Sequence, residues 1–421
     1  MGSRWYDVGV LSPETARRLW RLCFNVLQKG VVLKKVVPMN VIILSPHYPP
    51  NQINYARAVK RHGDVAIGIG DSASISDELR SVLDEYVYIA DMTQYDTMLR
   101  SVGYLTSKYG KIDRIDSQNE FWLGIESQLR EDFNITGQKP AQTDINRSKV
   151  GMKRVAQSAG LPVARGVEVE SLEQLRQFIG EVGLPVVVKP VVGVGAAATY
   201  CISHEDEIES TYHKIHGRYI CEEYIRGSIV TFDGFVDRHG HVEFQTSHEY
   251  NSGVMECVNA GRSIYYYNVT DIDPALIELG HRCIEAFGVR ERFFHIEWFR
   301  VSEHEYCFLE INVRPPGLYT IDMMNYSADI DLYEMWAASF HDEYPYRDNR
   351  LIYSVGFAGR RSNEVFKYSN EEIIQMYGNE IIEHAPVPGA FSDAMGEYYF
   401  MIRHRDVDRV RSMLKDILEL R

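Results

Sequence analysis

Short apolar runs alternate with helical segments over the first part of the chain. Each apolar run has the length of one buried strand, and the segments between the runs predict helices. Strands that alternate with helices are typical of right-handed crossover connections, and therefore of a parallel sheet. Residues 39–140 are thus predicted to form a parallel α/β domain. Its predicted strands are 41–45, 65–69 and 86–90, and its predicted helices are 52–62, 77–84 and 93–109.

The pattern changes near residue 141, where predicted strands begin to follow one another with few helices between them. Such spacing is typical of antiparallel sheets, so a second domain is predicted over 141–345. A small α+β domain is predicted over 346–421, and residues 1–38 are interpreted as an extension outside the main fold. The strands predicted here are 163–168, 185–190, 198–203, 218–223, 230–237, 241–247, 352–357 and 398–403, and the helices are 144–159, 204–214, 274–287, 328–340, 370–377 and 406–419.

Two apolar runs between residues 293 and 313 flank a polar segment, which predicts a β-hairpin with a four-residue turn. Side chains alternate along a strand, so Glu310, Asn312 and Arg314 are predicted to project from one face. The opposite face is predicted to carry Leu309, Ile311 and Val313. Two oxygen-bearing side chains and a guanidinium on one face suit the binding of anions and of a metal ion.

The register of this hairpin decides whether two acidic side chains meet. In a symmetric hairpin closed by Val301 and Tyr306, Glu297 lies directly opposite Glu310. Two like charges across a strand pair are destabilising unless something neutralises them. Mg²⁺ would do so, since it prefers oxygen ligands, commonly one or two carboxylates together with substrate phosphates. The alternative is a solvated edge hairpin with an incidental charge ladder. Glu297 lies in an otherwise apolar run, where an unpartnered charge is costly, so the site is favoured.

A lysine and a run of small residues follow one another near residue 190. Lys189 ends a predicted strand, and the loop after it contains Gly193 and Gly195. Glycines let backbone N–H groups approach phosphate oxygens closely, and Lys189 would add a positive charge. The loop matches neither the P-loop nor the dinucleotide-binding fingerprint. A glycine hairpin over a nucleotide and a simple tight turn therefore both remain open.

Two further segments carry carboxylates at the ends of predicted strands. One strand ends in Glu222 and Glu223 and continues into a loop, so it can offer a carboxylate and backbone groups to an adenine ring. An amphipathic edge strand is the alternative. Glu120 lies in a polar run after a strand of the parallel sheet, at the edge where ligands of such sheets bind.

The amino-acid composition limits which classes of protein this chain can belong to. The 421 residues are 45% hydrophobic and 25% charged, as in an ordinary globular protein. The net charge of −14 disfavours binding to nucleic acid or to anionic membranes. The 6 cysteines are far apart, which argues against a zinc site and a disulfide framework and favours reduced thiols. Charges interrupt any signal-peptide core in residues 1–38, and no apolar stretch reaches the roughly 18 residues of a membrane span. We therefore expect a cytoplasmic protein.

In this order, the segments resemble the ATP-grasp superfamily, in particular the branch that holds biotin carboxylase, the carbamoyl-phosphate synthetase large subunit and L-amino-acid ligases. The resemblance covers about residues 39–340 and implies a pre-ATP-grasp α/β domain followed by an ATP-grasp fold. Many members have a carboxylate where this chain has Ile229, which leaves Asp233 as a substitute for ribose binding. By resemblance, the ATP phosphates are contacted by Lys149, Lys189, Gly193 and Gly195, and the adenine ring is contacted by Glu222, Glu223, Tyr224 and Ile225. One or two Mg²⁺ (or Mn²⁺) ions are held by Glu297, Glu310 and Asn312, and the acyl-phosphate is contacted by Arg314.

The activity that this resemblance implies is ATP-dependent ligation of a small carboxylate to an amine through an acyl-phosphate, with release of ADP and phosphate. A free amino acid needs a carboxylate for its ammonium group and an arginine for its carboxylate. The candidates for these roles are Glu120, Glu249, Glu256 and Arg262. The alternatives are a bicarbonate-activating enzyme of the carboxylase or carbamoyl-phosphate synthetase type, a different carboxylate-activating ligase such as one acting in nucleotide biosynthesis, and a non-catalytic ATP-binding protein. The full set of metal and arginine residues disfavours the non-catalytic protein. Members of the superfamily are often dimers, so a homodimer is a further expectation.

Overall fold

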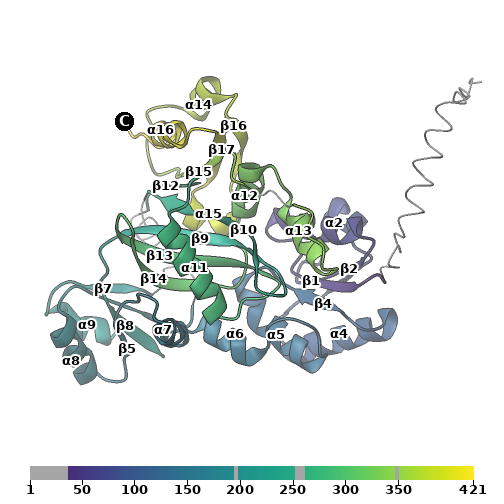
Figure 1. The fold of residues 1–421 in the computed structure, drawn as a ribbon, viewed down its shortest axis with the longest axis horizontal. Helices are drawn as coiled ribbons and strands as arrows, with labels where there is room; N and C mark the ends of the chain where they lie inside the picture. The colour runs from purple at the N-terminus through teal and green to yellow at the C-terminus, as the bar shows by residue number, and fades with distance from the viewer. Residues whose placement is uncertain (1–36, 194–197, 252–260, 347–349) are drawn as a thin grey trace, which may run out of the picture. The chain divides into compact units, whose positions relative to one another are not determined.

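The computed structural model describes residues 37–193, 198–251, 261–346 and 350–421 (Figure 1). Gly195, Glu256 and the predicted extension up to residue 36 lie outside these ranges. Within them, no helix combines the length and the apolar character that a membrane span needs.

The first domain is the parallel α/β unit that the sequence predicts. Its four strands are all parallel to their neighbours and lie in the order β3-β2-β1-β4. Apolar side chains of the strands pack against α4 and α5 in one buried cluster. The strands are β1 (Asn40–Leu44), β2 (Val65–Gly70), β3 (Glu85–Tyr88) and β4 (Arg114–Asp116), and the helices are α2 (Ile53–Arg61), α3 (Asp77–Val82), α4 (Tyr95–Tyr109) and α5 (Leu123–Asp132).

Two helices replace the single helix predicted over 144–159. They are α6 (Pro140–Arg147) and α7 (Lys149–Ser158), and Ser148 between them has an extended backbone with ψ of 116°. The Ser148 hydroxyl accepts a hydrogen bond from the Gly151 N–H at 3.2 Å, so Ser148 is the N-cap of α7. The prediction of one helix was wrong because a serine inside an amphipathic run can cap a new helix instead of continuing the old one.

A small antiparallel sheet follows, with the strand order β5-β8-β6-β7. Helices α8 and α9 lie beside it in Figure 1, and their apolar side chains share one buried cluster with the strands. Helix α8 was not predicted from the sequence. The strands are β5 (Gly166–Glu168), β6 (Val186–Pro190), β7 (Tyr200–Ile202) and β8 (Tyr219–Glu223), and the helices are α8 (Leu172–Val182) and α9 (Glu207–Tyr212).

A nine-stranded antiparallel sheet contains both the predicted hairpin and the tail. Its path is β14-β13-β9-β11-β12-β15-β17-β16, and β10 pairs with β9 off this path. The strands after residue 345 therefore extend the preceding sheet instead of forming one of their own, since β15 pairs with β12. The strands are β9 (Ser228–Val236), β10 (Val242–Thr246), β11 (His248–Tyr250), β12 (Ile264–Asn268), β13 (Arg292–Ser302), β14 (Glu305–Asn312), β15 (Ser354–Arg360), β16 (Ile381–Pro386) and β17 (Tyr398–His404).

Helices cover this sheet. The helix predicted over 328–340 corresponds to α13, whereas α12, α15 and β16 were not predicted. Helices α7 and α11 pack their apolar side chains on the face formed by Phe232, Ile296 and Ile311. The domain boundaries at 140 and 345 stay predictions. The helices are α11 (Pro274–Ala286), α12 (Thr320–Ala328), α13 (Leu332–Ser339), α14 (Asn370–Tyr377), α15 (Gly389–Met395) and α16 (Val407–Ile417).

The hairpin register is correct at the acidic pair and wrong at the turn. Glu297 lies opposite Glu310, as predicted, but the closing pair is Ser302 and Glu305 rather than Val301 and Tyr306. The pairing shifts between Glu297 and Trp298 and again between Arg300 and Ser302, so the two irregularities cancel. Because Leu309 is the extra residue at the first shift, Phe308 and not Leu309 joins Ile311 and Val313 in the buried apolar cluster.

A buried cluster of four charges joins the parallel domain to the start of β13. Arg292 Nη1 lies 2.6 Å from Asp116 Oδ1 and 2.8 Å from Glu126 Oε1. Arg130 Nη2 lies 2.7 Å from the same two oxygens. Arg292 Nε also donates to the Val313 carbonyl oxygen at 2.7 Å, beside the end of β14. Two positive and two negative side chains thus neutralise one another in the interior.

We expect Arg292→Met to lower the free energy of unfolding by about 3–5 kcal/mol, because Asp116 and Glu126 would stay buried with only Arg130 to neutralise them. Urea denaturation followed by tryptophan fluorescence measures this. Arg176→Met is the control: Arg176 pairs with Glu209 at the surface, where an ion pair contributes no more than about 1 kcal/mol. A loss in Arg292→Met no larger than in the control would contradict a stabilising role for the buried cluster.

Candidate active site

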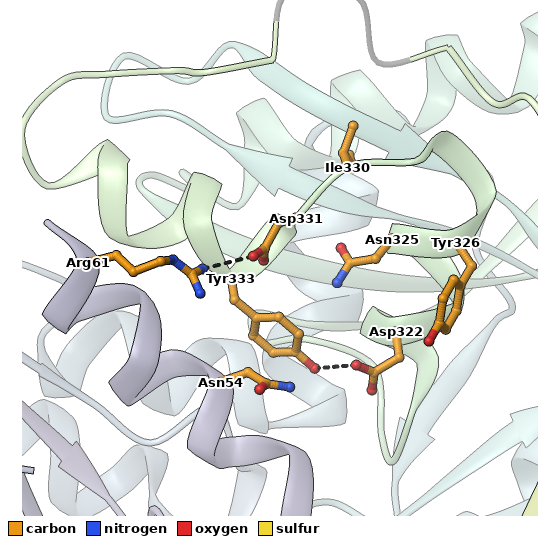
Figure 2. Close-up of a pocket in the computed structure, with 8 residues that line it drawn as sticks. All are labelled: Asn54, Arg61, Asp322, Asn325, Tyr326, Ile330, Asp331 and Tyr333. Atoms are coloured by element: carbon orange, nitrogen blue, oxygen red, sulfur yellow. Dashed lines mark hydrogen bonds and ion pairs between the residues drawn. The ribbon is translucent and has the colours of Figure 1, made fainter. Parts of the chain in front are cut away.

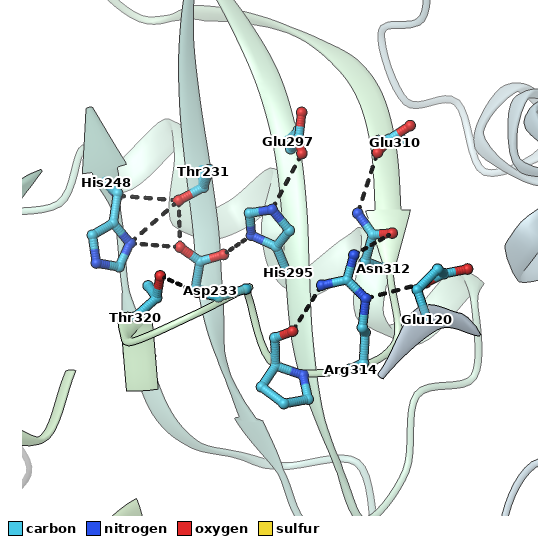
Figure 3. A network of polar contacts seen from close by, with 12 residues as sticks. Glu120, Thr231, Asp233, His248, His295, Glu297, Glu310, Asn312, Arg314 and Thr320 are labelled. Atoms are coloured by element: carbon cyan, nitrogen blue, oxygen red, sulfur yellow. Dashed lines mark hydrogen bonds and ion pairs between the residues drawn. The ribbon is translucent and has the colours of Figure 1, made fainter. Parts of the chain in front are cut away.

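One face of β9, β13 and β14 carries a grid of polar side chains (Figure 3). In the strand register, Glu297 lies opposite Glu310 on one neighbouring strand and opposite Thr231 on the other. His295, two residues earlier on β13, lies opposite Asn312 and Asp233 in the same way. These six side chains therefore form two adjacent rows across the strands, which we call the polar grid. The other face of the same strands is the apolar cluster that α7 and α11 cover. The predicted metal residues Glu297, Glu310 and Asn312 are therefore brought together on one polar surface.

Glu310 has positive charge beside it. Lys149 Nζ, at the start of α7, lies 3.4 Å from Glu310 Oε2, and the Asn312 amide donates to Glu310 Oε1 at 3.3 Å. Burial acts to raise the pKa of Glu310, but Lys149 and Lys189 outweigh it, so the pKa is lowered. Glu310 is held as a carboxylate, the form that binds a cation.

The carboxylates fit a divalent ion only with further ligands. Within the described residues, no group of three or more His, Cys, Asp or Glu side chains is arranged to hold a metal ion. Glu297, Glu310 and the Asn312 amide oxygen match the oxygen ligands that Mg²⁺ prefers, but they are fewer than its six coordination positions. Phosphate oxygens of a nucleotide would complete the coordination, so the residues suit a metal–nucleotide complex better than a metal ion alone.

Glu297 is held from behind by a chain of buried groups. His295 Nε2 lies 3.2 Å from Glu297 Oε1, and His295 Nδ1 lies 2.5 Å from Asp233 Oδ1. His248 Nδ1 lies 2.7 Å from Asp233 Oδ2, which also accepts from the Thr231 hydroxyl. One oxygen of Glu297 is thus oriented by His295, and the second is left for a cation.

The charges within this chain stabilise one another. Burial alone would raise the pKa of Asp233, but His295 and His248 lower it to about 2. Burial alone would lower the pKa of His295, but Asp233 and then Glu297 raise it to about 10. Asp233 is 0% exposed, and its two oxygens already accept from three side chains. This position does not suit the ribose contact expected for Asp233.

On the nucleotide side, two lysines share one carboxylate. Lys189 Nζ lies 2.9 Å from Glu222 Oε2, and Lys153 Nζ lies 3.3 Å from Glu222 Oε1. Lys153 also donates to the Ala164 carbonyl oxygen at 2.9 Å, and burial lowers its pKa although Glu222 opposes this. Lys153 was not predicted from the sequence as a site residue. The one feature that could have indicated it is its position one helical turn after Lys149, which places both lysines on the same face of α7.

The remaining nucleotide residues lie close by. The Gly193 carbonyl oxygen accepts from Lys149 Nζ at 3.2 Å, which joins the glycine loop to the start of α7. Glu223 pairs with Arg165 at 2.9 Å, so its side chain is already engaged. Tyr224 is 41% exposed and, like Ile225, follows β8, and the adenine contact of both residues stays a prediction.

Arg314 and Glu120 form the third part of the site. Arg314 Nε lies 3.1 Å from Glu120 Oε2, and its two other nitrogens donate to Pro315 O at 2.8 Å and to Asn312 Oδ1 at 3.5 Å. Arg147 Nε, at the end of α6, lies 3.4 Å from Glu120 Oε1. The structure thus brings Glu120 to Arg314 and to Arg147, and neither contact was predicted from the sequence.

The other acceptor candidates do not join them. Glu249 accepts hydrogen bonds from Tyr267, Arg300 and Arg411 at 2.5, 2.6 and 3.1 Å, and it pairs with Tyr267 on the face opposite to His248. Its carboxylate is satisfied and points away from the polar grid, so it does not suit a substrate ammonium. Arg262 is exposed, and its carbonyl oxygen accepts from Arg361 at 2.8 Å.

A separate hollow of about 290 Å³ lies between α2 and the helices α12 and α13 (Figure 2). Burial raises the pKa of Asp322 to about 6, although Asn51 and Tyr333 donate to its carboxylate at 2.8 and 2.9 Å. Arg61 in the same hollow pairs with Asp331 at 2.8 Å. Its lining has no lysine and no counterpart of the Glu297–Glu310 pair, so the polar grid is the better candidate for phosphate chemistry.

Comparison with known proteins shows what this chain is similar to. Residues 148–268 match the family described as carbamoyl-phosphate synthase L chain, ATP binding domain. An L-arginine-specific L-amino acid ligase of Bacillus subtilis is 25% identical over 261 residues, which span 59% of this chain and 63% of that ligase. The crystal structure of an L-amino acid ligase from Bacillus licheniformis has a TM-score of 0.72 at 15% identity, covering 90% of this chain and 96% of that one. The biotin carboxylase domain dimer of the Hydrogenobacter thermophilus 2-oxoglutarate carboxylase, in complex with MgADP, ADP and bicarbonate, has a TM-score of 0.64 at 16% identity and covers 90% of each chain.

The paired charges of Asp233 and His295 predict a pH dependence of stability. The pKa of His295 is raised from 6.5 to about 10, so its contribution is complete below pH 6.5 and is lost as the pH rises through 10. The pKa of Asp233 is lowered from 3.8 to about 2, so its contribution is complete above pH 3.8 and is lost as the pH falls through 2. The destabilisation caused by His295→Gln should therefore be largest between pH 3.8 and 6.5 and shrink towards pH 10.

Urea denaturation of both proteins across this pH range measures the difference. His213→Gln is the matched control, because the His213 side chain is 70% exposed. A difference between wild type and His295→Gln that does not change with pH would contradict the ion pair.

Proposed function

We propose that this chain, a member of the ATP-grasp superfamily, is an ATP-dependent ligase that joins a small carboxylate to an amine through an acyl-phosphate. The observation that carries the proposal is the register of β13 and β14, which sets Glu297 opposite Glu310 on the same face as Asn312. Lys149 on one side and Arg314 on the other complete a surface suited to a metal-bound triphosphate beside a second anion.

The nucleotide would lie between the small sheet and the polar grid. Lys149 and Lys189 would contact its phosphates, and the backbone of 223–225 would contact its adenine ring. Glu297, Glu310 and Asn312 would hold Mg²⁺, which when bound offsets charge on the β- and γ-phosphates. Glu222, now the shared partner of Lys189 and Lys153, would keep both lysines oriented for these contacts.

Ligation then follows in two steps. The carboxylate oxygen of the first substrate attacks the γ-phosphorus of ATP, the bond to the β-phosphate oxygen breaks, and ADP leaves. The uncharged amine of the second substrate attacks the acyl carbon, the bond from that carbon to the phosphate oxygen breaks, and phosphate leaves. The nitrogen loses a proton to solvent as the amide forms. Arg314 suits both steps, because a guanidinium can bind a carboxylate or a phosphate through two parallel hydrogen bonds. The protein needs no covalent nucleophile, since positioning and charge do the work.

Amino-acid substrates are supported by two features. Arg314 offers a guanidinium to a substrate carboxylate, and Glu120, once released from its ion pair with Arg314, offers a carboxylate to the substrate ammonium group. Both an amino-acid ligase sequence and an amino-acid ligase structure are among the similar proteins. Bicarbonate activation is the second candidate, because a carboxylase domain solved with bicarbonate shares the fold. A homodimer stays an expectation that the dimeric state of that domain supports.

Phosphate release from Mg·ATP, screened over pairs of amino acids and small carboxylates with and without bicarbonate, tests the proposal. We expect release that depends on a particular pair of substrates. Arg314→Ala and Glu310→Gln should each lower kcat by about a hundredfold or more, because each removes a charge that acts on the transferred phosphoryl group. Arg176→Ala, an exposed arginine on α8, should leave the rate unchanged.

The other outcomes separate the alternatives. Release stimulated by bicarbonate alone would replace the ligase by a bicarbonate-activating enzyme. Tight binding of Mg·ATP without turnover under any condition would contradict an enzymatic function. Turnover that persists in Glu310→Gln would show that the polar grid is not the site.

A further inference from the structure

The break between α6 and α7 directs two basic side chains to the same site. In a continuous α-helix, residues two positions apart point about 200° away from each other. Ser148 is extended, and an extended residue places its two neighbours on the same side. Lys149 therefore reaches Glu310 at 3.4 Å, and Arg147 reaches Glu120 at 3.4 Å.

Arg147 has more donors than the described residues satisfy. Its Nε is buried and makes no hydrogen bond, since the 3.4 Å separation from Glu120 is longer than the 2.7–2.9 Å usual for a charge-assisted bond. Glu120 is also shared with Arg314 at 3.1 Å, so one carboxylate faces two guanidinium groups. The three side chains carry a net positive charge, although they are only 14% to 27% exposed.

Among the described residues at the start of α5, no second anion is free to pair with Arg147. Arg147 Nη1 lies over the start of α5, where a Cβ on Gly124 would come within 2.8 Å of it. The start of a helix carries partial positive charge, which disfavours a cation there. Glu126, in the first turn of α5, is already engaged by Arg130 and Arg292. Arg147 is thus held in a position that an approaching anion would stabilise.

We propose that Arg147 and Arg314 together form a binding site for the carboxylate group of a substrate, in which Glu120 occupies both arginines until that carboxylate displaces it. The inference rests on the proposed ligase function and deepens it. Arg314 lies beside Asn312 and the metal residues, and Arg147 extends the anion site away from them, towards α5. The site suits a carboxylate, because two guanidinium groups can bind both of its oxygens.

Acetate is the probe, since it carries the carboxylate and nothing else that the site could recognise. Its binding is measured by NMR line broadening in saturating Mg·ADP, which occupies the phosphate-contacting lysines. Glu120→Gln should lower the Kd for acetate by about tenfold, because it removes the competing carboxylate. The double variant Glu120→Gln with Arg147→Gln should lose this gain, and Arg147→Lys should recover part of it. Arg176→Gln, paired with Glu209 at the surface, is the matched control and should bind acetate like the wild type.

Acetate binding that is the same with and without Arg147 would overturn the proposal, as would tighter binding of acetamide than of acetate. Titration of Mg·ADP into the same samples distinguishes failure of the carboxylate site from failure of the proposed ligase function. Normal Mg·ADP binding with no effect of Arg147 removes only the carboxylate site, whereas failure to bind Mg·ADP contradicts the ligase itself. Thermal unfolding of each variant confirms that it is folded. In the ligation assay, Arg147→Gln should raise the KM for the carboxylate substrate more than it lowers kcat.

Discussion

The register between β13 and β14 is the constraint on which the candidate site depends. Side chains alternate along a strand, so a slip of one residue would turn Glu310 and Asn312 into the apolar cluster under α7 and α11. The apolar partners on the other face, including Ile296 and Ile311, are fully buried and resist such a slip. The burial of one face thus fixes the acidic pair on the other, and the mutual repulsion of that pair is tolerated because Lys149 and His295 lie beside it.

Residues outside the nine-stranded sheet also fix the position of the candidate site. Arg292 begins β13, contacts the end of β4 through Asp116, and holds the carbonyl group of Val313. The next residue is Arg314, and Glu120 follows Asp116 after a short loop, so one guanidinium anchors both halves of the Arg314–Glu120 pair. A buried ion pair is weak evidence for stability on its own, but here its geometric role is plain. The parallel domain contributes to the site through this anchor.

The features that could be predicted from the sequence are those that depend on local periodicity. The parallel domain, the opposition of Glu297 and Glu310, and the lysine at the end of β6 all follow from strand spacing. The extra residue at Leu309 could not be predicted, because a bulge depends on packing across strands. Arg147 and Lys153 required knowledge of a helix break and of contacts with distant carboxylates. Glu249 was misjudged because Arg300 and Arg411, which neutralise it, are remote in sequence.

The shared sheet has a consequence for how the chain folds during synthesis. Until β15 has left the ribosome, β12 is an unprotected edge with the sequence I-Y-Y-Y-N, rich in aromatic side chains and poor in charge. Such an edge can pair with a strand of another nascent chain, and the polar grid would already be present on the same sheet. The strands β15, β17 and β16 therefore cover the β12 edge, and a chain shortened before residue 354 would expose this edge while keeping every residue of the polar grid.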